Sequence, residues 1–93
     1  MLLGVVDAAR MEALRRALHA AAVPGYTELP VIEGAGRTGV HAGDRVHPGA
    51  LAVVFTIVDD AAAAGLFETL VKQRDAAGDR VTRFFLLPVE RQG

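Results

Sequence analysis

The chain has 93 residues, of which 52% are hydrophobic, and its mean hydropathy is +0.30. This length predicts a single domain spanning 1–93, and the apolar content is high for a domain so small that much of its surface stays exposed. The formal net charge of -1 gives no electrostatic basis for binding nucleic acid or an anionic membrane. Cysteine is absent, which excludes disulfides, a thiol nucleophile and Cys-based zinc sites.

The start of the chain, MLLGVVDAAR, lacks the basic beginning and the long apolar core of a signal peptide. No apolar run approaches the ~18 residues that a membrane-spanning helix needs. We therefore expect a cytoplasmic protein without direct membrane insertion.

The first part of the chain predicts a strand, a helix and a second strand. Residues 2–6 form a short apolar run typical of a buried strand. Apolar residues then recur at helical spacing over 8–22, and a Pro-Gly pair ends this helix. Residues 26–33 predict the second strand, and Pro30 places it at a sheet edge or at a bulge because proline cannot donate a ladder hydrogen bond.

The second part predicts a strand, a helix and a final strand. The β-branched and aromatic run over 51–58 is the strongest strand signal. A second apolar stripe at helical spacing follows and is broken at Gly78, and residues 80–89 predict the last strand. Asp7 and Asp59 stand where the N-caps of the two helices are expected.

The order strand, helix, strand, strand, helix, strand predicts a ferredoxin-like α+β fold. Right-handed connections place both helices on one face of a four-stranded antiparallel sheet. A one-sided sheet normally alternates apolar and polar residues, but the third and fourth predicted strands are apolar on both faces. The uncovered face must therefore be buried by something outside the chain, and self-association is the commonest solution.

The segment 34–49, GAGRTGVHAGDRVHPG, is much longer than a hairpin needs and contains five glycines. A loop of this length in a compact domain is usually functional or disordered. Its G-x-G-x-x-G pattern is not a dinucleotide fingerprint, because no helix begins after the glycines. Glycine backbone N–H groups can still converge on an anion, with a charged fork from Arg37. The sequence leaves open the alternative that the glycines only turn the chain.

A second set of residues in this loop suggests a metal site. His41, Asp44 and His47 can all ligate a transition metal. Spacing within a glycine-rich loop fixes no geometry, so a solvated polar loop remains the alternative. The third histidine, His19, falls on the polar face of the first helix and is expected to be exposed.

Catalysis finds little support in the sequence. The chain has no serine and no cysteine, and no lysine stands beside a plausible base. The adjacent carboxylates Asp59 and Asp60 are expected to cap a helix and complement its dipole. We therefore expect a protein that is not an enzyme.

Several motifs together resemble the P-II signal-transduction family, and more closely its shortened P-II-like members. The segment 2–18, LLGVVDAARMEALRRAL, is similar to the opening strand and helix of that family. Gly34-Ala35-Gly36-Arg37 resembles its G-x-G-R entry to a long T-loop, and the ending 87–90, LPVE, resembles its final strand. The T-loop is reduced here, and the basic phosphate loop of the family is shortened to Gly78-Asp79-Arg80.

The resemblance implies a homotrimer with its sheets facing inward, and a small anionic effector bound between subunits. In this family the effector is commonly an adenine nucleotide (ATP, ADP or AMP), and the T-loop reports to a target protein such as a transporter or a metabolic enzyme. The residues expected to bind the effector are Gly34, Gly36, Arg37, Thr38, Gly39, Arg80 and Arg83.

Two other functions are weighed against this signalling role. The first is a divalent-metal-binding trimer resembling the cation-tolerance proteins, which share the fold and would use His41, Asp44 and His47 as ligands. The second is a structural module without a ligand.

Overall fold

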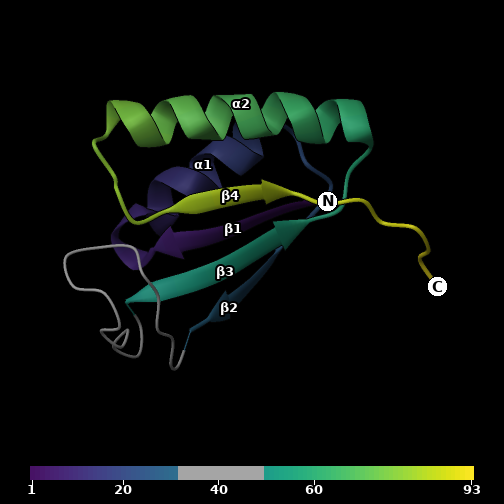
Figure 1. Cartoon of the computed structure of the whole chain (residues 1–93), viewed down its shortest axis with the longest axis horizontal. Helices are drawn as coiled ribbons and strands as arrows, with labels where there is room; N and C mark the ends of the chain where they lie inside the picture. The colour runs from purple at the N-terminus through teal and green to yellow at the C-terminus, as the bar shows by residue number, and fades with distance from the viewer. Residues whose placement is uncertain (32–49) are drawn as a thin grey trace.

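The structure is a computed structural model, and it describes residues 1–31 and 50–93. Four strands form one antiparallel sheet in the order β2-β3-β1-β4, with two α-helices on one side of it (Figure 1). The elements in chain order are β1 (Leu2–Asp7), the short 3-10 helix η1 (Ala8–Arg10), α1 (Met11–Ala20), β2 (Thr27–Pro30), β3 (Leu51–Thr56), α2 (Asp60–Ala76) and β4 (Arg83–Leu86).

This arrangement confirms the predicted ferredoxin-like βαββαβ fold. The sequence-adjacent strands β2 and β3 pair directly, whereas β1 lies between β3 and β4 in the middle of the sheet. The two crossovers are made by α1 and α2, which cover the same face (Figure 1). Pro30 lies in β2 at the edge of the sheet, as its missing N–H requires.

The hydrophobic core lies between this covered face and the helices. Along β1 and β3 every second residue is buried, as expected where one face of each strand meets the helices. On β1, Leu2 and Val6 are 4% and 1% exposed, and on α1, Leu18 is 1% exposed. The core cluster is completed by side chains from both helices and from β3, namely Met11, Leu14, Ala52, Val54, Leu66 and Leu70.

The opposite face of the sheet is also apolar, and no element among the described residues covers it (Figure 1). In the strand register one row joins Leu3 to Phe55 and Phe85, and the next joins Val5 to Val53. We call the set Leu3, Val5, Leu29, Val53, Phe55 and Phe85 the open face. Its edge members are the most accessible, with Leu29 50% and Phe85 47% exposed.

An aspartate caps α2 and another caps the 3-10 helix before α1, and both α-helices are followed by a left-handed residue. Asp59 caps α2, as predicted, by accepting a 2.8 Å hydrogen bond from the N–H of Ala62. Asp7 accepts from the N–H of Ala9 at 3.0 Å, and this cap begins a 3-10 turn that leads into α1. After α2 the chain reverses at Gly78 (φ 70°), and after α1 it reverses at Ala22 (φ 55°), two residues before the Pro-Gly pair predicted to end that helix.

Three of the four strands are shorter than the sequence predicts, whereas β1 extends one residue further, to Asp7. β3 ends at Thr56, which pairs with Leu2, the first residue of β1. β4 begins at Arg83 instead of residue 80, since the preceding residues form a turn that is described below. It ends at Leu86, after which Leu87 bonds the backbone of Met1 and the rest of the chain to residue 93 is exposed. Residues 32–33, predicted to continue β2, lie outside the described residues.

Gly4 is required in β1 by the close approach of an aromatic ring. A Cβ atom at this position would lie 3.0 Å from Cε1 of Phe84 and 3.1 Å from Cγ2 of Val6, both in the packed layer beneath the helices. We expect Gly4→Val to destabilise the fold by about 1–3 kcal/mol, the usual penalty for overpacking a core. Urea unfolding followed by circular dichroism measures this change.

The matched control for this prediction is Gly65→Ala in α2, where a Cβ atom would meet nothing within 4 Å. This substitution should raise stability by roughly 0.5–1 kcal/mol because alanine has the higher helix propensity. Equal stability of the wild type and Gly4→Val would contradict the close packing of Phe84 on β1.

Candidate functional site

Most of the predicted site residues lie outside the residues that the structure describes. These are Gly34, Gly36, Arg37, Thr38 and Gly39 of the predicted effector site, and His41, Asp44 and His47 of the predicted metal site. Their roles stay predictions. Within 1–31 and 50–93, no group of three or more His, Asp or Glu side chains is arranged to hold a metal ion.

The remaining two predicted residues, Arg80 and Arg83, lie in or next to the connection from α2 to β4. This connection reaches the sheet at the end where β1 stops, because Arg83 pairs with Val5 of β1. Ala50 and Leu51 lie at the same end, since Leu51 pairs with Asp7 and the carbonyl of Ala50 accepts a 2.9 Å hydrogen bond from the N–H of Ala8. The structure therefore brings the basic connection and the base of the long loop to one end of the sheet.

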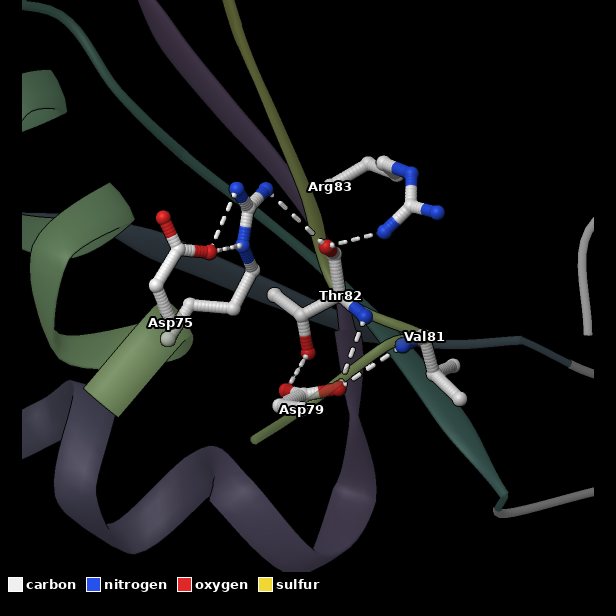
Figure 2. A network of polar contacts seen from close by, with 6 residues as sticks. Asp75, Asp79, Val81, Thr82 and Arg83 are labelled. Carbon is white, nitrogen blue, oxygen red and sulfur yellow. Dashed lines mark hydrogen bonds and ion pairs between the residues drawn. The ribbon is translucent and has the colours of Figure 1, made fainter. Parts of the chain in front are cut away.

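Asp79 organises this connection into a tight turn (Figure 2). Its Oδ1 accepts hydrogen bonds from the N–H groups of Val81 (2.8 Å) and Thr82 (3.1 Å), and its Oδ2 accepts the Thr82 hydroxyl. The Thr82 hydroxyl oxygen also accepts the N–H of Asp7 at 3.1 Å. One carboxylate thus holds three donors, and the turn is attached to the end of β1.

The ionised form of Asp79 is stabilised by these contacts. Partial burial acts to raise the pKa of this carboxyl, but the hydrogen bonds from the Thr82 side chain and from the N–H groups of Thr82 and Val81 outweigh it, with a smaller contribution from the positive charge of Arg10. The pKa of Asp79 therefore lies below its usual value, and the turn holds a permanent negative charge at neutral pH.

Arginine side chains gather around the same turn. The guanidinium of Arg83 donates to the carbonyl of Thr82 at 3.0 Å, and Arg74 of α2 reaches that carbonyl at 3.4 Å while also pairing with Asp75 at 3.0 Å. Arg83 is half-buried and Arg80 is exposed. Asp79 and Thr82 were not among the predicted site residues, although an aspartate followed three residues later by threonine after a helix-ending glycine is a turn signal.

The basic residues of α1 lie elsewhere. Arg15 forms a 2.7 Å ion pair with Glu28 of β2, and Arg16 lies 3.6 Å from Glu12 one helical turn away. The hydrogen bond and the charge of Glu28 raise the pKa of Arg15. His19 is exposed, as predicted. These groups tie α1 to the β2 edge or face solvent, and they do not extend the basic connection.

A large open groove lies between the helices instead of at the basic connection. Its volume is ≈ 760 Å³, and it runs between the C-terminal end of α1 and the N-terminal half of α2. It is lined mainly by small side chains, including Ala17, Ala21, Ala62 and Gly65, and neither Arg80 nor Arg83 contributes to it. This groove is therefore separate from the basic connection.

A family model described as Nitrogen regulatory protein P-II matches residues 1–92. The chain belongs to the P-II family. It is therefore a P-II signalling protein, and P-II proteins are regulators and not enzymes, which confirms the expectation drawn from the missing catalytic groups. The search of curated proteins found no match. In the described parts of this P-II chain, no helix is long and apolar enough to cross a membrane.

The lowered pKa of Asp79 predicts acid-sensitive stability. Because the pKa is lower in the folded than in the unfolded chain, the carboxylate stabilises the fold fully above the unfolded value of about 3.9, and this contribution is lost as the pH falls through the folded value. We expect Asp79→Asn to be less stable than the wild type at pH 7 and the difference to shrink toward pH 2. Urea unfolding at several pH values measures it.

A matched control is Asp60→Asn, which changes an exposed carboxylate in the first turn of α2. Its stability difference from the wild type should vary less over the same pH range. A constant difference between the wild type and Asp79→Asn from pH 7 to pH 2 would contradict the stabilised carboxylate.

Proposed function

We propose that this P-II protein is a cytoplasmic homotrimeric regulator that binds a small anionic effector, with adenine nucleotide as the leading class, and controls a partner protein. The observation that carries the proposal is the open face, an apolar sheet surface on a chain that matches the P-II model over residues 1–92. The partner would be a transporter or a metabolic enzyme, reached through the long loop.

The trimer is supported by the composition of the open face. Its members come from all four strands and neighbour one another in two adjacent rows of the register, so the apolar surface is not a set of isolated side chains. Soluble proteins rarely leave such a surface in water, and burying it contributes roughly 25 cal/mol for each Å² removed from water. Three copies packed through their sheets would bury the open face, and Arg83 would lie at one margin of it.

The effector site is supported by charge and position. Arg80 and Arg83 lie at the end of the sheet to which residues 32–49 are attached, next to a turn held rigidly by Asp79. Guanidinium groups form bidentate contacts with phosphate oxygens. A neighbouring copy packed on the open face would supply the second wall of a site that a single chain leaves open. The glycine-rich start of the loop, with Arg37, would provide further donors.

The first experiment concerns the trimer. We expect light scattering coupled to gel filtration to give three times the 9.8 kDa chain mass at micromolar concentration. Phe85→Asp should dissociate the trimer, because an unpaired charge buried in an apolar interface costs about 3–5 kcal/mol. Phe85 is 47% exposed on an edge strand, so its replacement should leave the fold of a single chain intact by circular dichroism.

The control for this experiment is Ala64→Asp, which adds the same charge to an exposed position of α2 on the helix side of the molecule. This variant should retain the wild-type mass. A wild-type protein that is monomeric at micromolar concentration would contradict the proposal.

The second experiment concerns the effector. We expect ATP to bind the wild type in isothermal titration calorimetry, and Arg37→Ala or Arg83→Gln to weaken it by about 1.5–3 kcal/mol, the range for a hydrogen bond to a charged group. Adenosine, which lacks phosphates, should bind far more weakly. Arg16→Gln, an exposed substitution on α1, is the control and should bind ATP like the wild type.

Two results would contradict a nucleotide effector. One is the absence of ATP, ADP and AMP binding to the wild-type trimer. The other is stabilisation by zinc alone, lost in a His41→Ala and His47→Ala double variant, which would favour the metal-binding alternative.

A further inference from the structure

Hydrogen bonds, joined through the backbone of Asp7 and Ala8, connect the basic turn to the base of the long loop. Thr82 is 2% exposed, and its hydroxyl is the centre of this set. The hydroxyl donates to Asp79 and accepts the N–H of Asp7, although Asp7 and Thr82 are 75 positions apart in the chain. The turn between α2 and β4 is thereby fixed to the last residue of β1.

The connection continues along the backbone at the end of β1. The next N–H group, that of Ala8, donates to the carbonyl of Ala50 at 2.9 Å, and the side chain of Asp7 accepts the N–H of Ala9 at 3.0 Å. Asp7 also pairs with Leu51 in the β1–β3 register. The peptide group before Asp7 is thus held by Thr82, and the peptide group after it is held by Ala50. A displacement of Thr82 would therefore be passed through Asp7 to Ala50.

The hydroxyl of Thr82 is not explained by packing alone. Valine has nearly the same shape and would fill the same buried volume, but it would leave the Asp7 N–H and one oxygen of Asp79 without this partner. Leaving a buried donor unpaired is costly, and among the described residues every buried side-chain nitrogen and oxygen has a partner. Position 82 therefore requires a side chain that can both donate and accept a hydrogen bond.

We propose that Thr82 is a positioning residue that couples the Asp79–Arg83 turn to Ala50, where the long loop rejoins the sheet. In this arrangement the turn, Thr82, Asp7, Ala8 and Ala50 shift together. An anion bound at Arg80 and Arg83 would then alter the base of the loop without touching it. This last step rests on the proposed function, whereas the coupling itself is a property of the folded chain.

The coupling is tested without any ligand by residue-resolved amide hydrogen exchange on the full-length protein. In Thr82→Val the amides of Asp7 and Ala8 should exchange about three- to tenfold faster than in the wild type, the size expected for losing one hydrogen bond. Thr82→Ser keeps the hydroxyl and should restore slow exchange at both. Asp79→Ala should also accelerate amide exchange at Ala8, although the Asp79 side chain does not contact that amide.

Control amides separate coupling from a general loss of stability. Ala62 at the cap of α2 and Leu18 in α1 lie away from the turn, and their exchange should change by less than about twofold. A uniform rise at all amides in Thr82→Val would show a purely structural role and overturn the proposal. Unchanged exchange at Ala8 in both Thr82→Val and Asp79→Ala would overturn it as well.

A second measurement adds ATP as the probe. In the wild type, ATP should slow exchange at 81–83 and at Ala8 together, and in Thr82→Val it should slow 81–83 while Ala8 no longer responds. An equal response of Ala8 in both proteins would overturn the coupling. If ATP fails to bind the wild type, the nucleotide effector is contradicted, and the ligand-free measurement alone decides the role of Thr82.

Discussion

The structure depends on one constraint: two helices can cover only one face of a four-stranded sheet, and here both faces are apolar. β1 and β3 carry large aliphatic or aromatic residues at successive positions, so each strand contributes one set to the core and another to the open face. Folding of a single chain buries the first set and leaves the second in contact with water. The open face is therefore the surface on which we propose that other copies of the chain pack.

This constraint also explains where we propose the effector site. The covered face is filled by the helices, and the open face is too apolar to bind a charged ligand. The remaining place for a charged ligand is the end of the sheet where β1 stops and the turn with Asp79 and Thr82 leads into β4. Arg80 and Arg83 are placed there by the same turn, and Ala50 returns the long loop to the same point. In the proposed trimer these charged groups would lie at the margin of the surface that packs against the other copies, where effector binding and assembly could influence each other.

The fold was predictable from the sequence because its signals are local. The prediction of these elements rests on the β-branched and aromatic run over 51–58, on the helical spacing of Leu14 and Leu18, and on the cap at Asp59, each of which depends on neighbouring residues. The uncovered face followed from the same pattern, since the predicted strands offered apolar residues on both sides. The predicted edge position of β2 followed from Pro30 alone.

The turn before β4 was not predictable in the same way. Residues 80–82 have the composition of a strand, but Asp79 bonds two of their N–H groups and Thr82 is directed toward Asp7, a partner from the opposite end of the sequence. No local pattern contains that contact. The glycines, Arg37 and the histidines of the long loop were singled out by composition, and composition specifies no geometry for a ligand.

The most direct test of this account detects contacts across the open face between different copies of the chain. Isotope-filtered nuclear Overhauser spectra of a sample mixed from labelled and unlabelled protein report only contacts between subunits. The account predicts such signals from the methyl groups of Leu3, Val5 and Val53 to the ring of Phe85 or Phe55 in a neighbouring copy. Methyl groups on this face that show contacts only within their own chain would contradict it.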